Sequence, residues 1–243
     1  MQTLDKVALF NPRPRIERVR LLNGRFCYVI DDALVDADAL VQFAVMNRAA
    51  FHPVNFSAYP GRYLGMPAPI ARRLDEFFAE HLRCDFDARR TVRMQCRLSM
   101  VTLAPTELRP FQSICHTDGQ HVDERHSIQA SVLYLFKDEA LGGTSFYEPA
   151  RPVQEMVELF RDSQQLTARE FTRKYGIAQS YLCASNDWFT QVGRIAARWN
   201  RIVFYDGRML HSGDIFAPEK LSDDPTAGRL TLNGFFTSRR NAS

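Results

Sequence analysis

The first part of the chain alternates apolar and polar positions in a way that predicts one strand and then two helices. RFCYVIDDAL reads as a strand that ends at paired aspartates. Asp36 is placed to cap a helix directly after it. A second helix is predicted over residues 67 to 83, because apolar residues recur there at helical spacing. The apolar positions are Ala39, Leu40, Phe43 and Ala44 in the first helix, and Ile70, Leu74, Phe77, Phe78 and Leu82 in the second.

From about residue 91 the pattern changes to short segments of strand character separated by turn signals. One helical interruption lies among them. Val153, Met156, Val157 and Phe160 predict a helix, and a T-x-x-E capping box opens a second one that ends near Gly176. The predicted strands are VRMQCRLSMVTL, QSICHT, SIQASVLYLF, TSFYEP, RIVFYDG and RLTLNGFFTS.

This order of elements predicts a β-sandwich or open barrel with helices packed outside it. We expect a single domain over residues 1–243. Residues 1–90 would form a strand and helix support, and residues 91–237 the β core, with a helical insertion at about 152–185. The insertion is either a lid or substrate wall, or a packing element.

Composition is that of an ordinary soluble globular protein. Of 243 residues, 45% are hydrophobic and 24% charged, enough for a sizeable core. A net charge of +3 is too small to predict a nucleic-acid partner. No apolar run is long enough to span a bilayer, and the first residues do not resemble a secretory signal. Five scattered cysteines without a C-x-x-C pair argue against disulfides and a cysteine-zinc site. We therefore expect a reducing, cytoplasmic setting.

Candidate chemistry centres on CHTDG. Residues two apart in a strand face the same side, so His116 and Asp118 can aim at one point if the strand continues through both. FYDGRMLHSGD supplies His211, interpreted as lying at the end of a strongly apolar strand. Two histidines and one carboxylate leave coordination positions open, which suits non-heme Fe(II). H-x-D with a distant histidine is a weak signal by itself, and three ordinary polar residues at strand ends are the alternative.

Neighbouring features strengthen the metal interpretation. A Gly-Gly turn, GGTSFYEP, follows the strand after H-x-D. Arg229, Thr231 and Asn233 share one face of RLTLNGFF by the two-residue period. A guanidinium beside a hydroxyl is a natural clamp for a carboxylate.

Together these residues resemble the 2-oxoglutarate/Fe(II) oxygenases, in their prolyl 4-hydroxylase-like branch, from about residue 95 to residue 237. The resemblance implies a mainly β fold with helices, built on a double-stranded β-helix (jelly-roll, cupin-like) core. It implies that iron is bound by His116, Asp118 and His211. It also implies that 2-oxoglutarate is held by Arg229, with Tyr134 and Thr231 as further contacts. Tyr134, in SVLYLFKD, is equally well interpreted as a core aromatic.

The chain departs from that family in three places, one of which is the helical insertion at about 152–185. The segment before H-x-D, VTLAPTELRPFQS, lacks the family's tyrosine. The interval from His211 to Arg229 is longer than usual and contains PEKLSDDPTAG, interpreted as a looped-out hairpin end. The arginines that could replace Arg229 are less well placed for an inward position; they are Arg208, Arg239 and Arg240.

The resemblance implies a dioxygenase that uses O2 and 2-oxoglutarate, with ascorbate as an optional reductant, and releases succinate and CO2. Its substrate would be an amino acid, a peptide or a small metabolite, and no nucleic-acid or membrane partner is expected. Two other functions stay open. One is a non-catalytic double-stranded β-helix that binds a ligand or a protein. The other is a zinc hydrolase that uses the same triad, with Glu124 or Glu148 as its general base.

Two nearby pairs have more than one interpretation. His121 and His126 could extend a metal site, but their polar surroundings favour a solvated loop at the mouth of the site. Asp206 and Arg208 either orient His211 or only form a turn. The sequence does not predict the oligomeric state.

Overall fold

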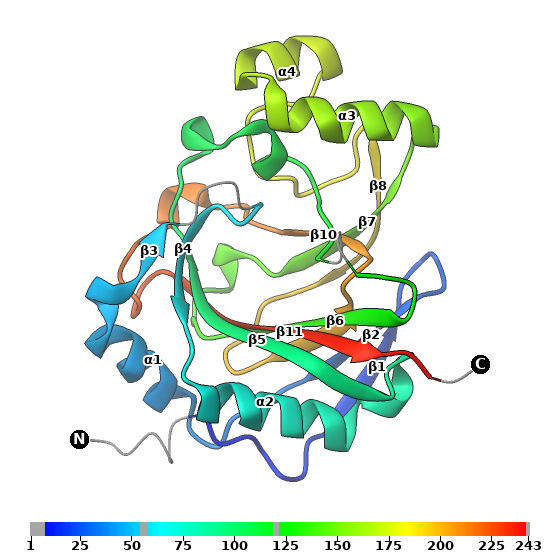
Figure 1. The fold of residues 1–243 in the computed structure, drawn as a ribbon. Coiled ribbons are helices and arrows are strands. Elements are labelled where there is room, and N and C mark those ends of the chain that lie inside the picture. The colour runs from blue at the N-terminus through cyan, green and yellow to red at the C-terminus, as the bar shows by residue number, and fades with distance from the viewer. Residues whose placement is uncertain (1–7, 54–57, 119–121, 242–243) are drawn as a thin grey trace.

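The computed structural model describes residues 8–53, 58–118 and 122–241 (Figure 1). Its helices are α1 (Ala37–Met46), α2 (Ala68–His81), α3 (Val153–Gln165) and α4 (Ala168–Tyr175). Its strands are β1 (Ile16–Arg20), β2 (Phe26–Ile30), β3 (His52–Pro53), β4 (Gly61–Gly65), β5 (Arg90–Val101), β6 (His126–Tyr134), β7 (Thr144–Pro149), β8 (Phe189–Ile195), β9 (Ile202–Asp206), β10 (Leu210–Gly213) and β11 (Arg229–Arg239).

The strands form two antiparallel sheets. The large sheet has eight strands in the order β1-β2-β9-β6-β11-β5-β4-β3, and the small sheet has three in the order β10-β7-β8. An isolated bridge between His116 and His211 extends the small sheet beyond β10. From β5 onward the chain passes repeatedly between the two sheets, and β11 returns to lie between β5 and β6. This is the strand order of a double-stranded β-helix, or jelly roll, so the predicted fold class is confirmed.

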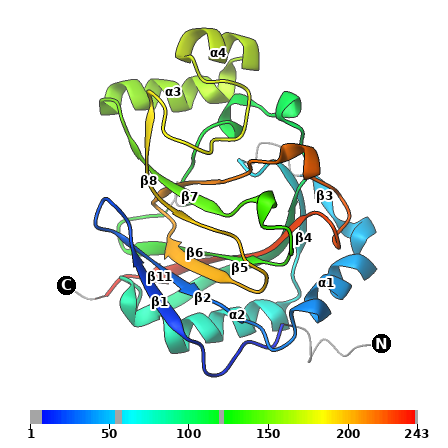
Figure 2. The same ribbon diagram turned by 180° about the vertical axis from the view of Figure 1, so that it is seen from behind.

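Helices α1 and α2 lie on the outer face of the large sheet, on the side away from the small sheet (Figures 1 and 2). The predicted apolar stripe of α2 is buried there, and the ring of Phe78 lies 4.4 Å from that of Phe236 and 5.9 Å from that of Phe204. Each such side chain contributes roughly 1.5–3 kcal/mol through burial. Asp36 accepts a hydrogen bond from Ala39 N at 3.0 Å, which confirms the predicted cap of α1.

The predicted helical insertion forms α3 and α4, which pack on the small sheet at the opposite end of the molecule from α2 (Figure 1). Thr167 and Glu170 make both halves of the predicted capping box at the start of α4. Gly176 ends that helix in the left-handed conformation, with φ of 68°. Met156 and Phe171 bury the two helices against β7 and β8. Local sequence signals therefore predicted both helices correctly.

The structure differs from the prediction in its shorter and more irregular parts. QSICHT is not a strand: a 3-10 turn, Pro110–Gln112, leads into an extended segment with one bridge. The prediction also missed β1, β3, β4, β8 and β10, which are short strands of mixed polarity. PEKLSDDPTAG is not a hairpin end, because it crosses from β10 in the small sheet to β11 in the large one. In the described ranges, no helix has the length and apolar character to cross a membrane.

Candidate metal centre

The fold brings the three predicted ligands together through backbone pairing. His116 N donates to His211 O at 3.0 Å, and His211 N donates to His116 O at 2.9 Å. Asp118 N donates to Gly207 O at 2.7 Å. The H-x-D segment is thus held extended beside β10 although it is not a continuous strand. His211 lies in β10, beyond the turn that follows β9, and not at the end of the apolar strand as the sequence suggested.

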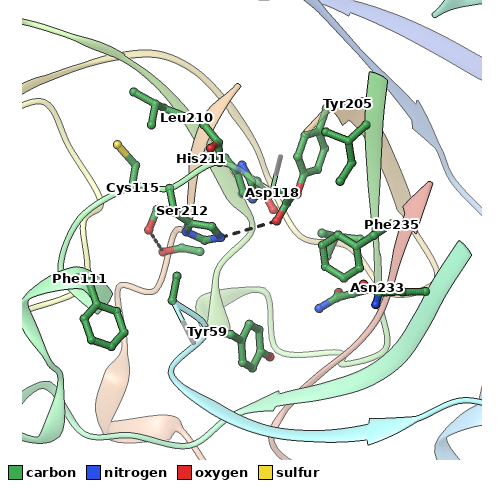
Figure 3. A pocket seen from close by; sticks show the side chains of 18 of the residues that line it. Tyr59, Phe111, Cys115, Asp118, Tyr205, Leu210, His211, Ser212, Asn233 and Phe235 are labelled. Carbon is green, nitrogen blue, oxygen red and sulfur yellow. Dashed lines mark hydrogen bonds and ion pairs between the residues drawn. The ribbon is translucent and has the colours of Figure 1, made fainter. Parts of the chain in front are cut away.

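Their side chains converge on one point, where Figure 3 shows His211 beside Asp118. His211 Nε2 lies 3.4 Å from Asp118 Oδ2, and His116 Nε2 lies 4.0 Å from Asp118 Oδ1. One ligand atom from each residue can be chosen so that all three lie within 4.8 Å of one another. Across the part of the chain that the structure describes, no other group of three His, Cys, Asp or Glu residues meets this condition. The spacing fits a single metal ion.

The protonation of the triad also suits a metal ion. Met209 O lies 2.9 Å from His211 Nδ1; a carbonyl only accepts, so Nδ1 carries the proton and Nε2 is left to coordinate. Burial, followed by the neighbouring His211, holds the pKa of His116 well below its usual range, so its imidazole is neutral. Burial raises the pKa of Asp118, whose Oδ2 has no hydrogen-bond partner among the described residues. A cation would satisfy that buried oxygen.

The triad opens into a cavity of about 950 Å³. One face of β11 lines the cavity, as the two-residue period of RLTLNGFF indicated. Arg229, Thr231 and Asn233 all contribute to this wall, and Figure 3 shows Asn233 across the cavity from the triad. The structure therefore places the predicted iron ligands and two of the three predicted 2-oxoglutarate contacts around one space.

Arg229 is 3% exposed and is held by the Gly-Gly turn. Its Nε donates to Leu141 O at 3.0 Å and Gly142 O at 3.1 Å, and one Nη donates to Gly143 O at 2.8 Å. Its other Nη has no hydrogen bond to any described residue, and the side chain lines the cavity. The turn thus fixes the guanidinium and leaves donors available for a ligand.

The Gly-Gly turn itself depends on close backbone contact. Gly142 has φ of 82°, and a Cβ there would lie 1.7 Å from Asp214 O. A Cβ on Gly143 would lie 1.9 Å from Ile195 O. Neither position has room for a side chain, so both glycines are needed to bring their carbonyls to Arg229.

Tyr134, the third predicted contact, lies behind the cavity wall and does not line it. Its side chain is fully buried, and its hydroxyl is 2.8 Å from Thr144 Oγ1. Thr144 does line the cavity. Burial raises the pKa of Tyr134 to about 12, so the phenol keeps its proton at neutral pH.

Tyr59 and Arg97 are among the cavity residues that sequence reasoning missed. Tyr59 reaches the cavity from the segment before β4, and burial raises its pKa. Arg97 reaches it from β5. A signal for Arg97 was present, because Arg93, Gln95 and Arg97 alternate with apolar residues and so form a polar face of the strand.

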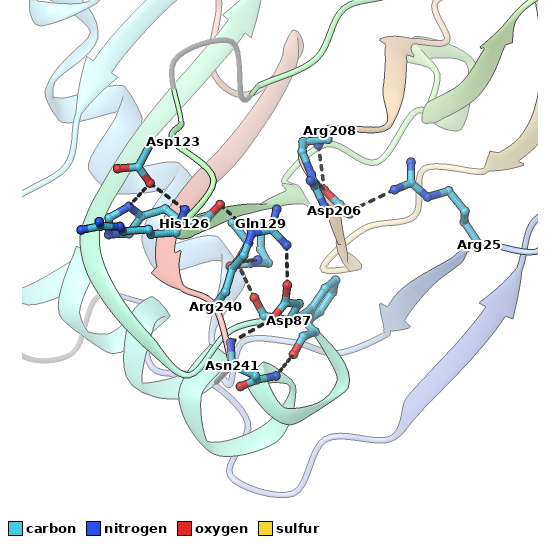
Figure 4. A network of polar contacts seen from close by, with 12 residues as sticks. Arg25, Asp87, Asp123, His126, Gln129, Asp206, Arg208, Arg240 and Asn241 are labelled. Atoms are coloured by element: carbon cyan, nitrogen blue, oxygen red, sulfur yellow. Dashed lines mark hydrogen bonds and ion pairs between the residues drawn. The ribbon is translucent and has the colours of Figure 1, made fainter. Parts of the chain in front are cut away.

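The polar residues that the sequence placed close to the triad pair with one another and not with the triad (Figure 4). His126 Nδ1 lies 2.6 Å from Asp123 Oδ1. His121 lies outside the described residues. Asp206 Oδ1 accepts a hydrogen bond from Arg208 N at 2.9 Å, so Asp206 and Arg208 form a turn. Asp206 Oδ2 also pairs with Arg25 at 3.2 Å on the surface. The orienting partner of His211 is the Met209 carbonyl.

The helical insertion forms one wall of the cavity. Val157, Phe160, Ser163 and Gln164, all on α3, line it together with residues of the two sheets. The sequence left open whether the insertion is a lid or substrate wall, or a packing element. Helix α3 packs on the small sheet and also lines the cavity. A ligand that fills the cavity would contact this helix.

Comparisons with known proteins give one family match and several similar solved structures. The model of a family of unknown function, DUF6445, matches residues 12–236. No curated protein matches the chain. A prolyl-4-hydroxylase of Pseudomonas putida is 15% identical, with a TM-score of 0.43, over 91% of this chain and 96% of that one. HygX of Streptomyces hygroscopicus, solved with nickel and 2-oxoglutarate, is 9% identical, with a TM-score of 0.48, over 90% of this chain and 84% of that one.

A third similar structure is the non-heme α-ketoglutarate-dependent carbocyclase SnoK of nogalamycin biosynthesis. It is 12% identical, with a TM-score of 0.45, over 89% of this chain and 81% of that one. At identities and TM-scores this low, what these three proteins bind is not carried over to this chain.

Proposed function

The chain belongs to DUF6445, a family of unknown function, and we propose that it is a non-heme Fe(II)- and 2-oxoglutarate-dependent dioxygenase. In this proposal it hydroxylates an amino-acid, peptide or small-metabolite substrate and releases succinate and CO2. The observation that carries the proposal is the convergence of His116, Asp118 and His211 in the same cavity as Arg229.

The donor set fits Fe(II). Two imidazoles and one carboxylate occupy one side of an ion and leave the other side for a co-substrate and oxygen. The buried Asp118 Oδ2 without a hydrogen bond is the atom such an ion would satisfy. Bound iron, with O2 and 2-oxoglutarate, would supply the oxidising chemistry. The protein's residues bind, orient and protect the reactants.

Arg229 is our candidate for binding the far carboxylate of 2-oxoglutarate. The Gly-Gly turn orients its guanidinium, which lowers the conformational entropy lost on binding. Thr231 lines the cavity two residues along the same strand face and adds a hydroxyl. We propose that Tyr134 acts indirectly, by holding the Thr144 hydroxyl in place at the cavity wall.

Water exclusion is the other task of this cavity. Phe160 on α3 and Phe235 on β11 line it with aromatic surface, and Tyr205 packs its ring 4.8 Å from that of His211. Apolar walls strengthen electrostatic interactions inside a site and limit side reactions with water. We also propose a reducing, cytoplasmic setting, since all five cysteines are free thiols.

The structure gives less support to a zinc hydrolase. Such an enzyme needs a general base beside the metal-bound water. Glu124 and Glu148, the two carboxylates considered for that role, are exposed and do not line the cavity. Glu148 accepts a hydrogen bond from Asn23 Nδ2 at 3.0 Å on the surface.

Succinate release from the purified protein tests the proposal. The assay contains Fe(II), ascorbate and 2-oxoglutarate and is screened across amino-acid, peptide and metabolite pools. Binding of 2-oxoglutarate to the Mn(II)-loaded protein is measured in parallel by calorimetry. We expect binding and metal-dependent succinate formation. Failure to bind 2-oxoglutarate would favour a non-catalytic binding module, and hydrolytic activity with zinc alone would favour a hydrolase.

A further inference from the structure

Arg97 has an unusual environment within the cavity. It lies on β5 directly opposite Asn233 of β11. Its guanidinium carbon is 3.9 Å from the centre of the Tyr63 ring and 4.6 Å from that of the Phe235 ring. Two aromatic rings therefore fix the plane of this cation, which leaves its edge as the part that can bind a ligand.

This cation has no anionic partner of its own. Across residues 8–53, 58–118 and 122–241, no carboxylate lies within ion-pair distance of Arg97, and its buried Nε makes no hydrogen bond. A guanidinium cannot lose its charge at physiological pH, so burial without a partner costs free energy. Elsewhere in the chain the half-buried Arg201 shows the usual solution, with Asp31 bound through two nitrogens at 2.6 and 3.0 Å. Arg97 lacks such a partner.

The position of Arg97 is next to the reaction centre. It lines the same cavity as the triad, and its neighbours Phe235 and Asn233 lie across that cavity from Asp118 and His211 (Figure 3). A ligand held by Arg97 would therefore lie beside the candidate metal ion.

A second unpartnered atom lies beside it. Asn233 is 6% exposed, and its Nδ2 donates to Ser99 Oγ at 3.0 Å. Its Oδ1 is buried and has no hydrogen-bond partner among the residues described. The opposed pair thus offers guanidinium donors for a carboxylate and one acceptor for an N–H group.

Arg97 and Arg229 are suited to two different ligands. Arg229 pairs with Val101 in the strand register and Arg97 with Asn233, four residues along β11. At about 3.3 Å per residue, their backbone positions lie roughly 13 Å apart. One arginine can hold the co-substrate while the other holds a second anionic group.

We propose that Arg97 and Asn233 bind the substrate, and that the substrate is an amino acid: Arg97 takes its carboxylate and Asn233 Oδ1 its amino group. That the ligand is a substrate rests on the proposed function. That Arg97 and Asn233 bind the ligand does not depend on it and can be tested without turnover.

The test is calorimetric titration of the Mn(II)- and 2-oxoglutarate-loaded protein with the standard L-amino acids and their carboxamides, without oxygen. At least one amino acid should bind, and its carboxamide should bind at least tenfold more weakly, since a charge-assisted pair is lost (about 10- to 100-fold). R97Q should weaken binding of the free amino acid by the same factor, while R97K should keep part of the affinity. R90Q, which changes an exposed arginine of the same strand outside the cavity, is the matched control.

Several outcomes would overturn the inference: no amino acid binds, acid and carboxamide bind alike, or R97Q binds the acid as tightly as the wild type. Loss of 2-oxoglutarate affinity in R97Q but not in R229K would also overturn it, by assigning Arg97 to the co-substrate. Unchanged 2-oxoglutarate binding in R97Q shows that this variant is folded. Failure of the wild type to bind 2-oxoglutarate would instead remove the proposed function, and the same titration with Mn(II) alone would still test Arg97.

Discussion

His116 and His211 donate backbone hydrogen bonds to each other, at 3.0 and 2.9 Å, while their imidazole rings lie 4.5 Å apart. Because this pairing uses only main-chain atoms, it holds the two segments that carry the imidazoles side by side. Removal of either side chain should leave this pairing intact. We therefore expect metal binding and folding to be separable at this site, unlike in domains that fold only around their metal.

Replacement of His116 or Asp118 by alanine should abolish iron-dependent succinate formation. Loss of a residue that only orients a metal ligand already costs about 10- to 100-fold in affinity or activity, so loss of a ligand should cost more. The measurements are succinate release with Fe(II) and calorimetric binding of Mn(II). The metal-free unfolding temperature should stay close to that of the wild type. His81→Ala on α2, outside the cavity, is the control, and undiminished turnover in both ligand variants would end the iron assignment.

Arg229→Ala should raise the apparent KM for 2-oxoglutarate by about tenfold or more, because a charge-assisted pair is lost. The same change removes the donor from three backbone carbonyls, so the variant should also be less stable. Arg229→Lys separates the two effects: it keeps the charge but cannot present a planar fork, and its KM should still rise. Arg208→Ala in the exposed turn should leave KM unchanged. An unchanged KM in both Arg229 variants would move the clamp elsewhere.

Sequence patterns predict the features of this fold that depend on local signals. The capping box of Thr167 and Glu170 and the two-residue period of β11 are visible in the sequence because they involve near neighbours in the chain. The family resemblance adds the fold and the identity of the triad. Local pattern and resemblance together predict most of the cavity wall that β11 forms, including Arg229 and Thr231.

What the sequence did not predict depends on pairing between distant segments. The H-x-D segment is extended because it is hydrogen-bonded to β10 and Gly207, about 90 residues later, and not because QSICHT has strand character of its own. The polar face of β5 was visible, but only the closure of the second sheet turns it into a cavity wall. For the same reason Tyr59 and Arg97 could not be assigned to the site from spacing alone.

Gly142→Ala should destabilise the protein more than Gly176→Ala. Both glycines have positive φ, a conformation that costs other residues about 1–3 kcal/mol. A Cβ at Gly142 would also meet Asp214 O at 1.7 Å, whereas nothing lies within 4 Å of a Cβ at Gly176. Denaturant titrations measure the free energy of unfolding of each variant. Because Gly142 O accepts a hydrogen bond from Arg229, Gly142→Ala should also bind 2-oxoglutarate more weakly. Equal losses of stability in the two variants would contradict the close-contact argument.

Asp162→Asn should lower the stability of the helical insertion in a pH-dependent way. Asp162 on α3 accepts hydrogen bonds from Lys174 and from Tyr175, each at 2.7 Å, which join α3 to α4. The hydrogen bond from Lys174, followed by that from Tyr175, lowers the pKa of Asp162 from 3.8 to about 2. A carboxylate with a depressed pKa stabilises the folded state fully above its unfolded pKa. That contribution is lost as the pH falls through the folded value.

The unfolding temperature of Asp162→Asn should therefore be a few degrees below that of the wild type at neutral pH, and the gap should narrow as the pH falls from about 4 toward about 2. Glu158→Gln is the control, since it removes the other, exposed partner of Lys174 and should have a smaller effect. Calorimetric scans across this pH range measure the difference in unfolding temperature between the wild type and each of the two variants. A gap that stays constant with pH would show that the carboxylate's charge is not what joins the two helices, and that the polar contact of the side chain alone is sufficient.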